Sequence, residues 1–317
     1  MKYRKLGKNG PEISVIGFGS WAIGGAGWIS SWGEQDDELS IKSVHRALDA
    51  GITFFDTAAV YGLGHAEEII GKALKSHRHE VVLATKCGLV WDEKGRIRRN
   101  GSYESIIREA ENSLRRLGTD YIDLYQMHWP DTDTKAPVEE TMRAMEKLVQ
   151  DGKVRYVGVS NFDVPLLEAA LKVRHVDSLQ PPYSILRREA EKQILPFCEQ
   201  NGIGVVAYSP LASGLLSGNY TVDKKFDKGD WRSRSREFKG EGLRRNLQVV
   251  DKLKTIAERL GVTLPQLAVA WVLAHPAVTA AIVGVRKPEH ISGILKAADI
   301  ELDEETVAEI RQIAESK

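Results

Sequence analysis

Eight short apolar runs, most of them followed by a helical pattern, restrict the fold of this chain more than any other feature. The runs cover residues 15–19, 53–56, 81–86, 122–128, 155–160, 178–180, 204–208 and 280–284. Most are almost continuously hydrophobic, which is typical of parallel strands that are covered on both faces. Eight strand–helix units in 317 residues predict an α/β fold, a (β/α)8 TIM barrel that forms a single domain over residues 1–317.

Helix-start, helix-stop and turn signals lie around these runs. Acidic residues at 36–38 begin a predicted helix that stops at Gly51, and Asp303 opens an extra C-terminal helix. Other helices are expected at 102–118, at 137–152, from 163, at 189–202 and from 263. Residues 3–6 and 12–15 flank Asn9-Gly10 and predict an N-terminal β-hairpin. Residues 217–242 show no pattern, and we interpret this long loop as a lid.

The charge and cysteine counts indicate which binding partners and which cellular compartment to expect. The chain has 44 basic and 44 acidic residues, so no overall charge favours nucleic acid or an anionic membrane. Glycines or His275-Pro276 interrupt the two uncharged stretches, so we expect no membrane span. Cys87 and Cys198 are too few for a disulfide framework, which favours the cytoplasm.

Ionisable side chains end three consecutive strands. Asp56 ends the second strand, Lys86 the third and His128 the fourth, and Tyr61 follows in the loop after Asp56. Alone, each has an ordinary interpretation, such as a helix cap, a surface aromatic or a buried histidine. The carboxyl ends of parallel barrel strands meet, so these residues are expected to converge. Lys86, held by Asp56, would lower the pKa of Tyr61, and His128 would orient a carbonyl oxygen. The group needs no metal ion.

Longer motifs surround these positions. They are GITFFDTAAVYG at 51–62, ATK at 84–86, DYIDLYQMH at 120–128, VGVSNF at 157–162 and SPLASGLL at 209–216. Together they resemble the aldo-keto reductase family over essentially the whole chain, and bacterial inositol-operon and general-stress reductases in particular. The resemblance implies NADPH-dependent reduction of aldehydes or ketones by hydride transfer. It also implies a catalytic tetrad with Tyr61 as general acid, whose members are Asp56, Tyr61, Lys86 and His128.

The resemblance further implies a set of residues that bind NADP(H). Those at the nicotinamide carboxamide are Ser160, Asn161 and Gln180, and the ring stacks on Tyr208. Those along the pyrophosphate are Ser209, Leu211, Ser213 and Gly214. Those at the adenosine end are Gly284, Arg286 and His290. Arg286 stands where the family contacts the 2′-phosphate, whereas His290 replaces a common glutamine, which leaves the strength of the NADP over NAD preference open.

Five tryptophans fall in predicted strand-end loops, and they are Trp21, Trp28, Trp32, Trp91 and Trp129. We expect several to line an apolar substrate pocket, Trp21 and Trp129 foremost, with core or lid packing as the alternative. Residues 223–245 carry nine basic and five acidic side chains. This segment either closes on the cofactor phosphates or forms a solvated loop.

Three other functions compete with a reductase. Residues 17–22, GFGSWA, match a dinucleotide fingerprint, but GGAG follows at 24–27 and predicts a loop instead of the required helix. Some relatives are NADP(H)-binding regulatory subunits of channels with little turnover; the short segment before the predicted hairpin leads us to expect an enzyme instead. A Schiff-base lyase would use Lys86 as nucleophile. The expected partner is a small-molecule carbonyl, with monomer and homo-oligomer both left open.

Overall fold

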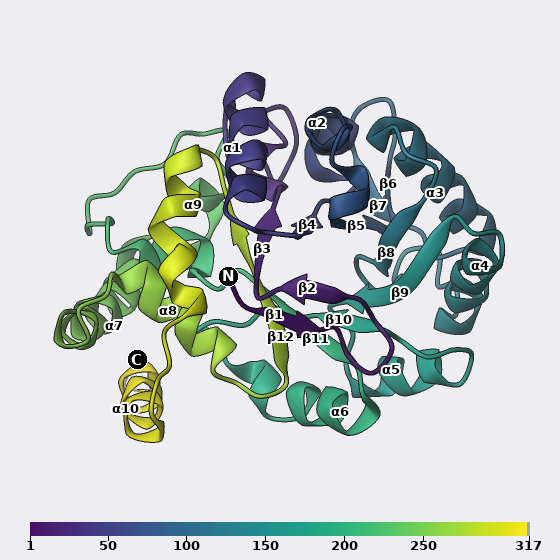
Figure 1. The fold of residues 1–317 in the computed structure, drawn as a ribbon. Helices are drawn as coiled ribbons and strands as arrows, with labels where there is room; N and C mark the ends of the chain where they lie inside the picture. Colours follow the sequence, from purple (N-terminus) through teal and green to yellow (C-terminus); the bar gives the residue numbers. More distant parts are fainter. Residues whose placement is uncertain (316–317) are drawn as a thin grey trace.

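The computed structural model describes residues 1–315 and shows a closed barrel of parallel strands surrounded by helices (Figure 1). The barrel strands are β3 (Ile16–Gly19), β4 (Phe54–Asp56), β5 (Val82–Cys87), β8 (Ile122–Met127), β9 (Val154–Ser160), β10 (Ser178–Gln180), β11 (Gly204–Tyr208) and β12 (Val278–Gly284). Neighbours in the barrel follow chain order, and β12 pairs with β3 to close it. The (β/α)8 prediction is confirmed, because each of the eight apolar runs became a barrel strand.

Ten α-helices occur within residues 1–315. They are α1 (Asp37–Asp49), α2 (His65–Leu74), α3 (Tyr103–Leu117), α4 (Val138–Gln150), α5 (Val164–Leu171), α6 (Ile194–Asn201), α7 (Gly240–Arg259), α8 (Leu264–Leu273), α9 (Pro288–Ile294) and α10 (Glu304–Glu315). The extra C-terminal helix is α10. The sequence patterns did not predict α2, α7 or α9.

Local capping explains several helix ends. The Asp36 carboxylate accepts a hydrogen bond from the amide of Leu39 at 2.7 Å and begins α1. Thr263 and Gln266 form the reciprocal capping box that starts α8. Gly118 ends α3 with a φ of 62°, a left-handed conformation that glycine adopts without steric cost.

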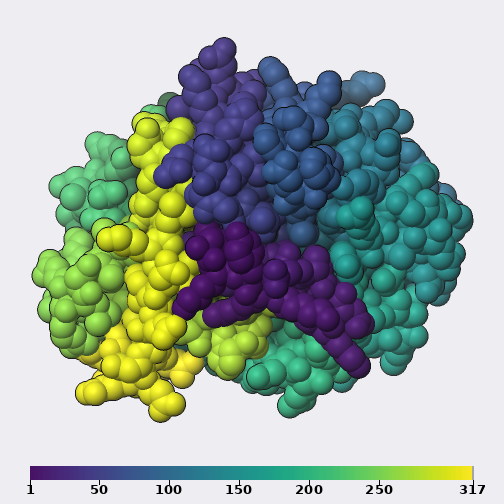
Figure 2. Space-filling view, viewed as in Figure 1, coloured from purple at the N-terminus to yellow at the C-terminus, as the bar shows by residue number. Residues whose placement is uncertain are grey.

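The N-terminal hairpin closes one end of the barrel. Its strands β1 (Tyr3–Lys5) and β2 (Glu12–Ser14) pair antiparallel. Figure 2 shows the hairpin lying across this face of the molecule. Leu6 and Ile13 are fully buried and pack with Phe54 and Leu124 inside the barrel. The open end is therefore the opposite one, where the strands have their carboxyl ends.

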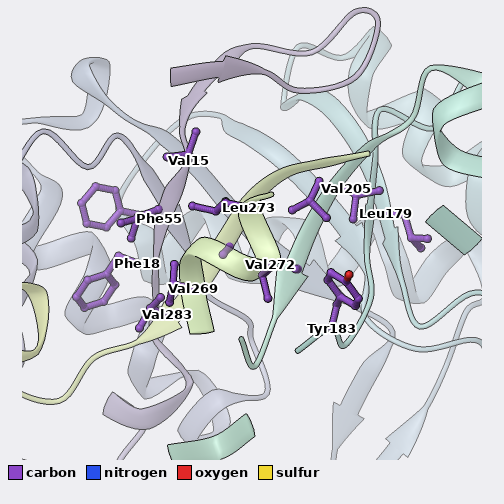
Figure 3. Packing of buried hydrophobic residues seen from close by; sticks show 14 of the residues in the cluster. Val15, Phe18, Phe55, Leu179, Tyr183, Val205, Val269, Val272, Leu273 and Val283 are labelled. Atoms are coloured by element: carbon purple, nitrogen blue, oxygen red, sulfur yellow. The ribbon is translucent and has the colours of Figure 1, made fainter. Parts of the chain in front are cut away.

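A larger apolar layer lies between the strands and the outer helices. In Figure 3, Val269, Val272 and Leu273 of α8 lie beside barrel residues such as Val205 and Val283. Every α8 residue except Pro265 is buried, which accounts for this uncharged stretch of sequence. Within residues 1–315 no single helix is long and apolar enough to cross a membrane; only α7 and α8 taken together, bent by 89°, pass by length and composition.

The segment expected to be an irregular lid is partly ordered. Short 3₁₀ turns occupy Trp231–Arg234 and Arg236–Phe238, and α7 begins at Gly240. Inside α7, Leu243, Leu247 and Val250 are buried at a helical spacing, a signal that the sequence contained. A small antiparallel hairpin of β6 (Leu89–Trp91) and β7 (Ile97–Arg99) also follows β5 and was not predicted.

Candidate active site

The four residues expected to converge lie together at the carboxyl end of the barrel. Lys86 Nζ donates to Asp56 Oδ1 at 2.6 Å, to the carbonyl of Thr57 at 2.8 Å and to the Tyr61 hydroxyl at 3.3 Å. The rings of Tyr61 and His128 are 5.6 Å apart and nearly perpendicular. Lys86 is 1% exposed and Asp56 3%, so this ion pair is shielded from water.

Burial controls the proton affinities of this group. It raises the pKa of Tyr61 well above its ordinary value, and the charge of Asp56 raises it further. Burial lowers the pKa of Lys86, although the charge of Asp56 acts in the opposite direction. Burial also lowers the pKa of His128 well below its ordinary value, and the charge of Lys86 lowers it further. The pKa of Tyr61 is therefore raised instead of lowered as expected, because burial and, after it, the charge of Asp56 set its direction.

Two glutamines donate hydrogen bonds to the carboxylate of the Lys86–Asp56 ion pair. Gln180 Nε2 donates to Asp56 Oδ2 at 2.9 Å, and Gln126 Nε2 reaches the same oxygen at 3.4 Å. Gln126 was not singled out in the sequence, although it lies within the DYIDLYQMH motif at a strand position that faces the barrel interior. Its only signal was its place two residues before His128, because alternate residues of a strand share a face.

Polar groups from β9 and β11 join next to His128. The Asn161 amide donates to the carbonyl of His128 and to Ser160 Oγ, both at 3.0 Å, while its oxygen accepts from the Tyr208 hydroxyl at 2.9 Å. Asn161 adopts a φ of 60°, a left-handed conformation that asparagine tolerates better than most residues. The three hydrogen bonds of its side chain hold it in this position.

One continuous cavity of about 760 Å³ begins at these residues. Every residue expected to act in catalysis, cofactor binding or the substrate pocket lines it, except Lys86, which lies behind the wall. Its polar wall includes Ser209, Ser213 and Gly214, and its far end is formed by Gly284, Arg286 and His290. The same cavity therefore joins the group around Tyr61 to the polar residues Arg286 and His290.

The backbone after β11 makes a tight turn through left-handed residues. Ser209, Ala212, Ser213 and Gly214 all have positive φ values, of 55°, 47°, 53° and 96°. The amides of Ala212 and Gly214 already donate to the carbonyls of Ser209 and Leu211, at 2.9 Å each, so they are used inside the loop. The segment was expected along a pyrophosphate, and it contributes Ser209, Ser213 and Gly214 to the cavity wall.

Arg286 differs from the expectation of a free phosphate ligand. Its Nε donates to Gln35 Oε1 at 2.8 Å, its Nη1 donates to the carbonyl of Trp32 at 3.1 Å, and its Nη2 donates to the carbonyl of Glu34. Gln35 Nε2 donates in return to the carbonyl of Arg286 at 3.0 Å. The guanidinium is thus bound to the loop between β3 and α1.

Tryptophans form the apolar wall beside Tyr61. Of the five strand-end tryptophans, four line the cavity, and these are Trp21, Trp28, Trp32 and Trp129. Trp91 instead lies in β6, near Arg116. Trp231, which the sequence did not highlight, stacks on Trp21 with ring centroids 5.5 Å apart.

The segment expected to be a lid crosses the loop that carries these tryptophans. The amide of Trp231 donates to the carbonyl of Ser31 at 2.9 Å, and Trp32 pairs with Asp230 as an isolated β-bridge. Arg232, held by Asp230 at 2.5 Å and by the Tyr220 hydroxyl at 2.6 Å, lines the cavity. The segment therefore covers the cavity.

Within residues 1–315, no cluster of three or more His, Cys, Asp or Glu residues could hold a metal ion.

Comparison with known proteins places this geometry in context. The chain is 39% identical to the aldo-keto reductase YhdN of Bacillus subtilis strain 168, covering 100% of this chain and 94% of that protein. It is 35% identical to an NADH-specific methylglyoxal reductase of Escherichia coli strain K12, covering 100% and 99%. It is also 35% identical to a probable voltage-gated potassium channel subunit beta of rice, Oryza sativa subsp. japonica, covering 100% and 98%.

Structural similarity agrees with the sequence matches. The glycerol dehydrogenase AKR11B4 from Gluconobacter oxydans superposes with a TM-score of 0.88 at 39% identity, covering 98% of this chain and 94% of that one. The sequence model of the Aldo/keto reductase family matches residues 15–315. The chain therefore belongs to the aldo/keto reductase family.

Proposed function

We propose that the protein reduces aldehydes or ketones to alcohols with NADPH, and that Tyr61 is the general acid. The observation that carries this proposal is the contact of Tyr61 with a buried Lys86–Asp56 pair at one end of the long cavity. When bound, the nicotinamide would supply the hydride. Family membership supports the oxidoreductase class, whereas the choice of NADPH and the role of Tyr61 belong to this proposal.

The surroundings of Tyr61 suit a proton donor. The Tyr61 hydroxyl is protonated at neutral pH, because the ordinary pKa of tyrosine is about 10 and burial raises it further. It can donate its proton to a carbonyl oxygen when the phenolate that forms is stabilised. Lys86, 3.3 Å away, then stabilises the negative charge left on Tyr61. His128 stays neutral because its pKa is lowered, and a ring N–H can hold the same carbonyl oxygen.

The cavity walls fit a nicotinamide dinucleotide. Tyr208 offers its ring beside the catalytic group, and Ser160, Asn161 and Gln180 offer polar atoms for a carboxamide. The loop after β11 lies along the cavity wall and would border the pyrophosphate. Arg286 and His290, at the far end, would hold the adenosine part, with His290 as an uncommon choice at its position. Trp21 and Trp129 would contact the substrate.

A cofactor-binding regulatory subunit is the second candidate, favoured by the similarity to a probable channel subunit. Tight NADPH binding, without reduction of any carbonyl in a broad panel, would support it. A Schiff-base lyase is disfavoured, because Lys86 is 1% exposed, donates to three oxygens and does not line the cavity.

Replacing the proposed general acid tests the reductase. Tyr61→Phe removes only the hydroxyl, so we expect kcat to fall about a hundredfold or more while the NADPH affinity stays unchanged. Turnover is followed by the absorbance of the reduced nicotinamide with a panel of aldehydes and ketones, and binding by quenching of tryptophan fluorescence. Tyr3→Phe is the control, since that hydroxyl lies in the hairpin and donates to Gly51. Full activity of Tyr61→Phe would refute the assignment.

A further inference from the structure

Gln35 and Arg286 hold each other across the far end of the cavity. Gln35 lies just before α1 and Arg286 just after β12, so they come from opposite ends of the chain. The glutamine oxygen accepts from Arg286 Nε and its amide donates to the Arg286 carbonyl. Two further carbonyls, of Trp32 and Glu34, accept from the same guanidinium. We call this set of four hydrogen bonds the Gln35–Arg286 latch.

The latch occupies the part of Arg286 that an incoming phosphate needs. A guanidinium binds a phosphate best through two parallel N–H groups, and the Nε and Nη2 groups form one such pair. In Arg286 that pair donates to Gln35 and Glu34 instead. A phosphate that takes this pair must replace hydrogen bonds inside the protein, whereas the three printed acceptors leave two of the five guanidinium N–H groups for other contacts.

The second arginine that lines the cavity does not replace Arg286. Arg232 also lines the cavity, but both carboxylate oxygens of Asp230 accept from it. His290 uses its Nδ1 to accept from the amide of Arg286 at 3.3 Å, and its pKa is lowered by burial. Because His290 is neutral and Arg232 is paired with Asp230, Arg286 is the cavity-lining side chain best suited to bind a phosphate.

We propose that Gln35 is a positioning residue that sets the preference between NADPH and NADH by restraining Arg286. The 2′-phosphate of NADPH would compete with Gln35 for the Nε and Nη2 groups of Arg286, whereas NADH lacks this phosphate and leaves the latch intact. The inference rests on the proposed function, because it assumes that the cavity holds a nicotinamide dinucleotide. Its consequence is a weaker preference for NADPH than a free arginine would produce.

The test measures the affinities of both cofactors in variants of Gln35. Gln35→Ala frees the Nε group of Arg286, so we expect NADPH to bind roughly three- to tenfold more tightly, the effect of one ordinary hydrogen bond, with NADH binding changed less than about twofold. Gln35→Glu would hold Arg286 by charge and repel the phosphate, so it should weaken the binding of NADPH and leave the binding of NADH unchanged. Dissociation constants come from the quenching of tryptophan fluorescence by NADPH and NADH.

Two further variants separate restraint from general loosening. Ser40→Ala removes the hydrogen bond from Gln35 Nε2 to Ser40 Oγ, at 3.1 Å, and leaves the Gln35–Arg286 latch in place. It should move both affinities together or neither. Arg286→Ala should bring the two affinities close to each other.

The outcomes distinguish this inference from the proposed function. Binding of both cofactors with an unchanged affinity ratio in Gln35→Ala would overturn the inference and leave the reductase standing. Weaker NADPH binding in Gln35→Ala would also overturn it, because Gln35 would then prepare Arg286 for the phosphate. If the folded wild-type protein bound neither cofactor, the proposed function would fall and the inference with it.

Discussion

At the scale of single residues, two buried glutamates behind β5 have different environments. Glu67 forms an ion pair with Arg116 at 2.6 Å and accepts from Thr85. Glu109 accepts only neutral hydrogen bonds, from the amide of Gly88 at 2.8 Å and from Ser105 at 3.0 Å. Burial therefore raises the pKa of Glu109 from 4.5 to about 7.

The Glu109 carboxyl makes stability depend on pH. The folded protein holds its proton up to about pH 7 and the unfolded chain only up to 4.5, so its contribution is fully present below 4.5 and is lost as the pH rises to about 7. Glu109→Gln keeps an acceptor and a donor without the charge. We expect it to raise the free energy of unfolding by up to about 3 kcal/mol at pH 8 and to change it little near pH 4.5, measured by urea unfolding.

Glu67→Gln is the matched control, because it leaves the Arg116 guanidinium without its carboxylate. It should lower the free energy of unfolding at pH 8. The interpretation of Glu109 would be refuted if both variants shifted stability in the same direction at pH 8.

At the scale of elements, α2 and α3 approach closely at one glycine. A Cβ on Gly71 of α2 would lie 2.7 Å from Leu117 Cα at the end of α3. Gly71→Ala should therefore lower the free energy of unfolding by about 1–3 kcal/mol, the usual effect of overpacking. Gly293 of α9 has no atom within 4 Å of such a Cβ. Gly293→Ala should be neutral or stabilising by up to about 1 kcal/mol. Denaturant midpoints measure both, and equal destabilisation would contradict the packing argument.

At the scale of the whole molecule, the two ends of the chain close one structure. Ala281 of β12 lies opposite Ile16 of β3, and Lys2 forms an ion pair with Glu301 at 2.8 Å. No barrel strand can leave without opening this closed sheet. We therefore expect the chain to behave as a single domain and to unfold in one transition, with equal calorimetric and van't Hoff enthalpies. Two resolved transitions in calorimetry would contradict this expectation.

Much of this fold could be predicted because each barrel strand is marked by a short apolar run and by helix or turn signals next to it in the sequence. The run 204–208, GVVAY, has no charged residue, and several of the predicted helices end at glycines. Parallel strands then force Asp56, Lys86 and His128 to one end without any knowledge of their contacts. The helices that were missed have weaker start signals: α2, α7 and α9 follow Gly64, Lys239 and Lys287, and none of these supplies a side-chain cap.

Sequence alone determined the strand order and the family motifs, and hence which residues surround the cavity. Only the tertiary structure decided how those residues are used. It joined Gln126 to Asp56, placed Trp231 on Trp21 and bound Arg286 to Gln35. The reason is physical: periodicity and capping act over a few neighbouring residues, whereas hydrogen bonds between Gln35 and Arg286, and the pKa of Tyr61, depend on groups that only folding brings together and removes from water.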